Sequence, residues 1–189
     1  APVAAEVSAA PVAVAAPVVS SATEGPADRP VSCKEALYAI LAIQAKIRPD
    51  QIQDGETIDD IFDGVSSRRN QVLLDIGAEF SMGPIDGAHE KPVAVLAQEI
   101  TAITSRYQAP GKYLGVTQEE ALKRVLGRAG MGRKDVHAYL EESYGLGDGW
   151  RGSVMNMLAL ESRAGDSTRG GTLGKLGDAS VGQKADAKS

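Results

Sequence analysis

The sequence predicts an all-α domain held between two linkers. Between residues 32 and 162, apolar side chains recur at helical spacing in successive segments, and no segment reads as a convincing strand. Residues 1–31 and 163–189 contain few large apolar side chains, so neither end is expected to share in a hydrophobic core. These observations favour one helical domain that is tethered at both ends.

The two ends predict different kinds of linker. Residues 1–31 are a low-complexity stretch of Ala, Val and Pro, and the repeated prolines favour an extended, semi-rigid spacer. Residues 163–189 are rich in Gly, Ser, Thr, Lys and Asp, which is typical of a flexible linker or tail. We therefore expect the domain to occupy residues 32–162.

The first helix is expected to begin at Ser32, because Ser32 and Glu35 have the spacing of a capping box, and to end before Pro49. A long connection follows, from Pro49 to Ser66. Its spaced apolar residues are expected to pack back onto the helices. The apolar positions of the helix and the connection are Leu37, Ile40, Leu41, Ile47, Ile52, Ile58, Ile61 and Phe62.

The second helix begins near Ser66 or Ser67 and stops before Gly83 and Pro84. A third helix is predicted from about Pro92 to Tyr107, with the proline in its first turn. The apolar stripe of the second helix is formed by Val72, Leu73, Ile76 and Phe80.

The remaining segments predict three shorter helices. A second capping box, 117–120, is expected to open a helix that ends in the glycine-rich stretch 127–132. Further helices are predicted over 134–144, with Gly145 as a C-cap, and over 150–161. Trp150, at the start of the last helix, is expected to be a core residue.

Charge and composition exclude several classes of protein. A net charge of −5 without a clustered Lys/Arg surface argues against nucleic-acid binding. Cys33, His89 and His137 are isolated and provide no disulfide, no metal-ligand spacing and no convergent catalytic set. We therefore predict no metal and no independent enzyme, with Cys33 a packed small residue. The lone cysteine and the absence of a bilayer-spanning apolar run predict a cytoplasmic protein without a membrane partner.

Ser66 has the most distinctive position of any polar residue in the chain. It follows Asp63, Gly64 and Val65, where an acidic loop meets an amphipathic helix. A hydroxyl at a helix start is exposed, and the amides of the first turn favour a phosphate attached there. The alternative is that Ser66 or Ser67 only caps the helix. The local sequence leaves both interpretations open.

The wider spacing resembles acyl carrier proteins from the first helix to Phe80. In that family, apolar residues lie 14, 8 and 4 positions before the modified serine and 6, 7, 10 and 14 positions after it. Counting from Ser67 loses this register, so the resemblance selects Ser66. Relative to Ser66, these places hold Ile52, Ile58, Phe62, Val72, Leu73, Ile76 and Phe80.

The chain resembles in particular the carrier domains of fungal-type and giant bacterial type I fatty acid synthases. The resemblance implies a four-helix acyl-carrier bundle over 32–107, extended by appended structural helices over 108–162. Val65 departs from ordinary carriers, which have Asp before the modified serine, but fungal-type carriers share this departure. The stretches that carry the resemblance are Thr57–Ile61, Gly64–Asn70, Asp75–Phe80, Val136–Leu140, Tyr144–Gly147 and Met155–Leu160.

The resemblance also implies a function. The domain would shuttle a growing acyl chain as a thioester on a 4′-phosphopantetheine arm at Ser66, with no catalytic residue of its own. Its implied partners are the ketoacyl synthase, ketoreductase, dehydratase, enoyl reductase and acyl or malonyl transferases of the same large homo-oligomeric synthase. A phosphopantetheinyl transferase is needed to attach the arm. The alternatives are a helical docking module in which Ser66 is a plain cap, and a polyketide or peptide synthase carrier.

Charged residues around Ser66 predict a docking surface. Six carboxylates lie between Asp50 and Asp63 without a Lys or Arg among them, and such a face suits weak docking to basic surfaces. A solvated polar loop is the alternative. Arg68 and Arg69 follow Ser66 where the helix dipole disfavours cations, so we expect them to contact phosphate or a partner. The predicted docking residues are Asp59, Asp60, Asp63, Arg68 and Arg69.

Overall fold

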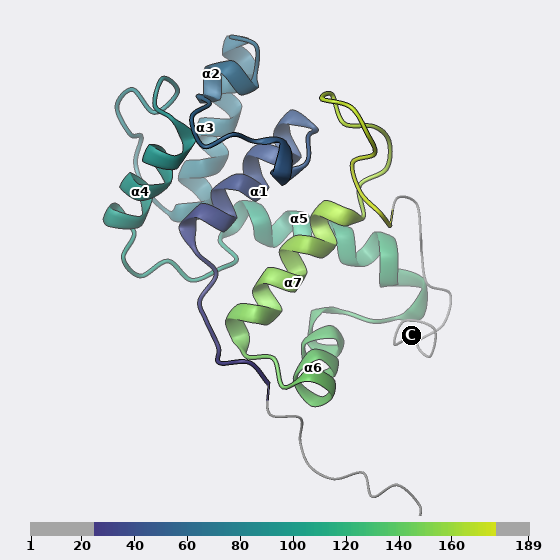
Figure 1. The fold of residues 1–189 in the computed structure, drawn as a ribbon. Helices are drawn as coiled ribbons and strands as arrows, with labels where there is room; N and C mark the ends of the chain where they lie inside the picture. The colour runs from purple at the N-terminus through teal and green to yellow at the C-terminus, as the bar shows by residue number, and fades with distance from the viewer. Residues whose placement is uncertain (1–24, 177–189) are drawn as a thin grey trace, which may run out of the picture.

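A computed structural model of the chain describes residues 25–176 and confirms the all-α prediction for this part (Figure 1). Within it there is no strand, and only two isolated bridges pair backbone segments, Thr57 with Pro92 and Asp166 with Thr172. None of the helices in this range is long and apolar enough to cross a membrane. The elements are α1 (Cys33–Ala45), the 3-10 turn η1 (Pro49–Gln51), α2 (Ile58–Ile61), α3 (Ser66–Phe80), α4 (Val93–Ile103), α5 (Lys112–Leu126), the 3-10 turn η2 (Gly127–Ala129), α6 (Arg133–Tyr144) and α7 (Asp148–Glu161).

The first hydrophobic core surrounds α1, which packs against α3, α4 and α7. Leu37, Ile40 and Leu41 of α1 are completely buried, and their spacing of three and four residues places them on the inward side of the helix. Ser32 caps α1 through its side chain, which accepts a hydrogen bond from the Glu35 amide at 3.1 Å. The predicted first helix is confirmed, although it ends at Ala45 because Lys46 adopts a left-handed conformation.

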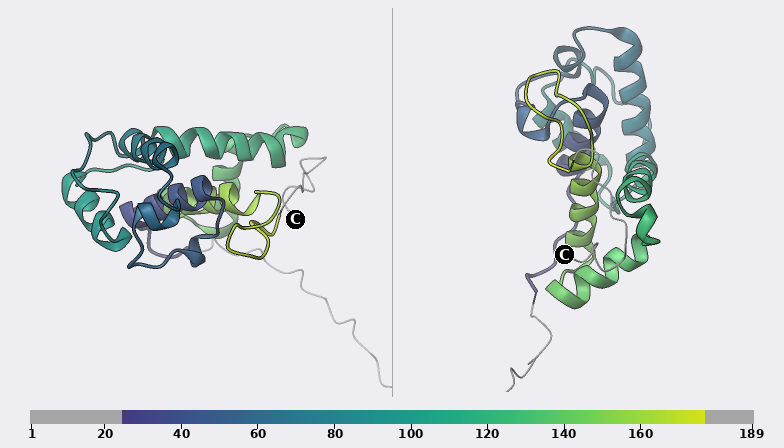
Figure 2. Two further views of the ribbon diagram at one scale, coloured as in Figure 1. Left: turned by 90° about the horizontal axis from the view of Figure 1, so that it is seen from above. Right: turned by 90° about the vertical axis from the view of Figure 1, so that its right-hand side faces the viewer.

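A second, smaller core lies between the appended helices. It contains Leu122 and Val125 of α5 together with Met131 and Met155. The views in Figure 2 show the domain drawn out from the α2–α4 end to the α6–α7 end. Helix α5 contacts both α3 and α7 and so joins the two halves, whereas α6 has no fully buried residue.

The predicted start of the fourth long helix is wrong. Helix α5 begins at Lys112, and Thr117 lies within it and donates its hydroxyl hydrogen bond to the Tyr113 carbonyl. The helix starts early because Glu79, at the end of α3, accepts hydrogen bonds from the amides of Gly111 and Leu114 at 2.7 Å each. A buried carboxylate from another helix therefore replaces a local cap.

Two other boundaries differ from the sequence prediction. The connection after Pro49 contains η1 and α2, because Thr57 and Asp60 form a capping box within it. Helix α4 ends at Ile103 and not at Tyr107, because Thr104 leaves the helical conformation.

Residues 163–176, which we call the strap, pack against the domain, whereas the sequence suggested a flexible linker from Arg163 onward. Arg169 reaches back to Glu56 with two hydrogen bonds, of 2.7 and 2.9 Å. Arg48 donates to the carbonyls of Gly170 and Thr172, and Leu173 is only 6% exposed. These polar contacts cannot be read from composition, since each joins residues more than 100 positions apart.

The segment just before α1, residues 25–31, also makes contacts that a linker prediction does not include. The Asp28 carboxylate accepts hydrogen bonds from the amides of Gly149 and Trp150, so it caps the start of α7. The Arg29 guanidinium lies 4.3 Å from the centre of the Trp150 ring, and the indole N–H donates to the Ala27 carbonyl. Trp150 is therefore not the core residue that the sequence predicted but a partly buried anchor of this segment. Residues 1–24 and 177–189 of the predicted linkers lie outside the described range.

Candidate functional site

Ser66 is the first residue of α3 and is exposed. The turn before it is tight, because Asp63 and Gly64 both have positive φ angles, 52° and 67°. The Gly64 amide donates to the Asp59 carbonyl at 2.8 Å, and the Val65 amide donates to the Phe62 carbonyl at 3.0 Å. This hydrogen-bonded turn holds the start of α3 at the end of α2 and presents Ser66 to solvent.

The Ser66 hydroxyl is not used as a helix cap. Val65 is the N-cap of α3 and has no side chain that can accept a hydrogen bond there. Within residues 25–176, no hydrogen-bond partner is found for the hydroxyl of Ser66 or of Ser67. The alternative interpretation of Ser66 as a plain N-cap is therefore wrong for this structure. The hydroxyl is exposed, unbonded and placed at the positive end of a helix dipole, which fits the attachment of a phosphate ester.

Replacing Val65 with aspartate should stabilise the unmodified domain by about 1 kcal/mol. An aspartate at the N-cap accepts hydrogen bonds from free first-turn amides and interacts favourably with the helix dipole. Val65 is 42% exposed, so no core packing is lost. The free energy of unfolding, measured by chemical denaturation, tests this. Val116→Asp is the control, because Val116 is 57% exposed but lies inside α5, and an equal gain there would contradict the capping argument.

Several predicted docking residues have partners inside the domain. Asp59 and Arg69 form an ion pair of 3.2 Å, which ties α2 to α3. Asp60 accepts hydrogen bonds from the amide and the hydroxyl of Thr57, and these hydrogen bonds lower the pKa of its carboxyl. Asp63 and Arg68 are exposed, and neither forms an ion pair within the described residues. A role of these five residues in docking stays a prediction.

The other carboxylates of the acidic stretch are also paired. Arg48 lies 3.0 Å from Asp50, and Lys34 lies 3.1 Å from Asp54. The pKa values of Asp50, Asp54 and Glu56 are all lowered, and in each case a side-chain hydrogen bond is the largest cause. The donors are Arg48 for Asp50, Tyr38 for Asp54 and Arg169 for Glu56. The electronegative face is therefore weaker than the acidic stretch alone suggests, because cations outside this stretch pair with its carboxylates, from Arg48 two residues away to Arg169 in the strap.

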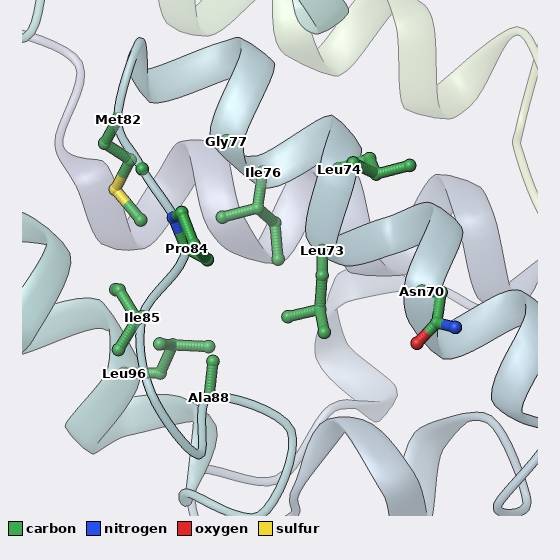
Figure 3. Close-up of a pocket in the computed structure, with 11 residues that line it drawn as sticks. Asn70, Leu73, Leu74, Ile76, Gly77, Met82, Pro84, Ile85, Ala88 and Leu96 are labelled. Atoms are coloured by element: carbon green, nitrogen blue, oxygen red, sulfur yellow. The ribbon is translucent and has the colours of Figure 1, made fainter.

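An apolar cleft of ≈ 480 Å³ opens beside α3 (Figure 3). One wall is the side of α3 that continues from Ser66, since residues four, seven, eight and eleven positions later share a helix side. By helix geometry this wall begins about 6 Å and ends about 16 Å along the axis from Ser66. The opposite walls come from the 82–88 loop and α4. The lining residues are Asn70, Leu73, Leu74, Ile76, Gly77, Met82, Gly83, Pro84, Ile85, Ala88 and Leu96.

The sequence analysis did not identify this cleft. The only sign of it in the sequence was Leu74, an apolar residue on α3 outside the stripe that packs inward. In the structure Leu74 is exposed and lies on the side of α3 that continues from Ser66. The 82–88 loop carries Met82 and Ile85, but no periodic pattern places a loop against a helix.

Cys33, His89 and His137, which the sequence did not link to any function, do not come together into a second site in the described residues. Cys33 is buried, as predicted, with its sulfur 3.5 Å from the Thr104 hydroxyl oxygen. Across residues 25–176 there is no cluster of His, Cys, Asp and Glu that could hold a metal ion. His89 lies beside Glu90, and His137 lies in α6.

We expect acid to destabilise the packing of α6 through His137. Burial, followed by the charges of Arg151 and Arg133, lowers the pKa of this imidazole, and Asp148 only partly opposes them. In the unfolded chain the imidazole takes up a proton near pH 6.5. Because the folded state binds that proton less readily, stability should fall as the pH drops through this value.

Denaturation of the wild type and of His137→Gln on both sides of pH 6.5 tests this expectation. The wild type should lose more stability than the variant on the acidic side. An unchanged pH dependence in His137→Gln would contradict the assignment.

Taken together, the fold and the site define a helical domain of the carrier class, with an exposed serine at a helix start beside an apolar cleft. A family model described as the fatty acid synthase subunit alpha acyl carrier domain matches residues 27–166, and the chain belongs to this family.

Similar proteins include three fungal fatty acid synthase alpha subunits. The subunit of Schizosaccharomyces pombe is 29% identical over 136 residues, covering 70% of this chain. That of Candida parapsilosis is 29% identical over 131 residues, covering 68%, and that of Penicillium patulum is 32% identical over 136 residues, covering 70%. The chain spans only 7% of the length of each of these relatives.

Proposed function

We propose that this domain carries a growing acyl chain on a 4′-phosphopantetheine arm attached to Ser66. The observation that carries the proposal is the Ser66 hydroxyl, which is exposed and has no partner within the described residues, at the first position of α3. Membership in the acyl carrier domain family supports the assignment. No other exposed serine of the described range combines this helix position with an adjoining apolar cleft.

The residues around Ser66 fit such a group. The hydrogen-bonded turn from Asp59 to Val65 precedes an exposed Ser66, and the first turn of α3 favours a negatively charged ester. When bound, phosphopantetheine supplies a thiol that forms a thioester with an acyl group. The chain itself then contributes position and not catalysis, because tethering raises the concentration of the cargo near each catalytic site.

The apolar cleft is the place where we expect the acyl chain to be sheltered. Its size falls in the range of ordinary ligand pockets, and its walls are almost entirely aliphatic. The wall that continues from Ser66 provides a direct path along α3. A chain of CH₂ groups that leaves water for such a cleft gains about 0.8 kcal/mol for each group that is buried.

The proposed partners follow from the family. The domain would visit the ketoacyl synthase, the reductases, the dehydratase and the transferases of a multifunctional, homo-oligomeric synthase in the cytoplasm, after modification by a phosphopantetheinyl transferase. Family membership favours fatty acid synthesis over polyketide or peptide synthesis.

The test is mass spectrometry after co-expression with the transferase domain of the parent synthase. The wild type should gain the mass of one phosphopantetheine, the peptide that contains Ser66 should carry it, and Ser66→Ala should abolish it. Ser67→Ala, the matched control one position away, should be modified fully. A transferase that modifies an established substrate carrier but leaves this chain unchanged would refute the proposal and favour the docking-module alternative.

A further inference from the structure

A second pocket, of ≈ 280 Å³, lies beside the start of α3. We call it the cationic pocket. Its lining comes from the end of α1, the end of α2, the first turns of α3 and the strap, so four separate segments converge on it. The lining residues are Gln44, Ala45, Lys46, Phe62, Ser67, Arg68, Gln71 and Thr168.

Two positive charges face this pocket without a counter-charge. Lys46 and Arg68 are both exposed, and no carboxylate forms an ion pair with either of them within residues 25–176. Three nearby cations differ from them, because Arg48, Arg69 and Arg169 each form an ion pair with a carboxylate. A pocket lined by two cations without ion-pair partners, together with the polar side chains of Gln44, Ser67 and Thr168, is suited to an anion.

On α3, the lining of the pocket begins one residue after Ser66. Ser67 is the next residue, and Phe62, the C-cap of α2, belongs to the turn that presents Ser66. Arg68, two residues after Ser66, lines the pocket from the first turn of α3. The amides of this first turn receive no side-chain cap, and they add further donors at the same place.

The strap fixes the position of Lys46. The Thr168 amide donates to the Lys46 carbonyl at 3.0 Å, and the Thr168 hydroxyl donates to the Ala45 carbonyl at 3.3 Å. The next residue, Arg169, is anchored by Glu56. The strap therefore forms one wall of the cationic pocket and holds its lysine in place.

We propose that Lys46 and Arg68 bind the phosphodiester of the arm on Ser66. The two pockets then bind different parts of the modification. The cleft binds the apolar acyl chain, and the cationic pocket binds the phosphodiester that links the arm to Ser66. This inference rests on the proposed function, since it requires a phosphate ester at Ser66. It adds Lys46, Arg68 and the strap to the residues that position the arm.

Nuclear magnetic resonance of the unmodified and modified domain tests the inference. Modification should shift the amide resonances of Lys46 and Thr168, and the ³¹P line of the bound arm should relax like the folded domain. In Lys46→Gln/Arg68→Gln these shifts should be lost and the ³¹P line should sharpen. The control, Lys123→Gln/Arg128→Gln, removes two exposed cations of α5 and η2 and should behave like the wild type.

Each other outcome has a defined meaning. Intact mass reports the modification itself, so a chain that is never modified refutes the proposed function together with this inference. A modified chain in which Lys46 and Thr168 do not shift, or in which the control loses the shifts equally, refutes the inference alone. Shifts that appear only when the transferase is added would assign the two cations to partner docking and would also overturn it.

Discussion

Replacing Glu79 with alanine should lower the free energy of unfolding by about 3 kcal/mol or more. Glu79 is only 1% exposed, and its carboxylate accepts hydrogen bonds from the Tyr107 hydroxyl and from the amides of Gly111 and Leu114. Removing it leaves three donors without their acceptor, one of them the buried Leu114 amide, and each unsatisfied buried donor costs about 1–3 kcal/mol. Chemical denaturation should measure the loss. Hydrogen exchange should increase most, relative to the wild type, in the first turn of α5.

Tyr107→Phe is the matched control, because it removes one of the three hydrogen bonds and keeps the ring. Its packing against Phe80, with ring centroids 4.8 Å apart, stays in place. The expected loss is about 1 kcal/mol. Burial and the hydrogen bond to Glu79 raise the pKa of Tyr107, which is the direction expected for a hydroxyl that donates to a carboxylate. If Glu79→Ala costs no more than Tyr107→Phe, Glu79 does not organise the start of α5.

Replacing Leu173 with alanine should destabilise the domain by about 2 kcal/mol. Leu173 is 6% exposed, and its amide donates to the Gly165 carbonyl at 2.9 Å, which closes the strap on itself. Truncation of a buried leucine removes its transfer free energy and leaves a cavity. A true linker would show no loss, so this substitution separates a packed strap from a tail. Thermal and chemical denaturation both measure it.

Leu176→Ala provides the comparison within the same segment. Leu176 is 41% exposed, so its truncation should cost much less. Equal and negligible losses at both positions would show that the strap does not pack in solution. Hydrogen exchange of the Thr168 amide gives a second measurement that does not depend on either side chain.

The elements that were predicted correctly are those determined by their own sequence. Helix α1 has its cap and its apolar stripe within 16 residues of chain, and α3 has a regular stripe ending at Phe80. The register of apolar residues around Ser66 also led to an exposed helix start, which the structure shows. Local periodicity and local capping are sufficient for such elements.

The features that could not be predicted depend on contacts between distant residues. The start of α5 is set by Glu79, which lies 35 positions before Leu114, so the local capping box at Thr117 was misleading. The strap looks like a linker because it is held by Arg48 and Arg169 more than by apolar side chains. The free cations of the cationic pocket could not be recognised either, since the sequence does not say which cations find a carboxylate.

The attachment of residues 25–31 to α7 determines where the chain enters the domain. In Figure 1 this purple segment arrives at the α6–α7 end, whereas α2 and the start of α3 lie at the opposite end, and the right-hand view of Figure 2 agrees. The length of the described domain therefore separates this entry point from Ser66. A group attached to Ser66 would lie almost a full domain length from residue 25, where the described chain begins.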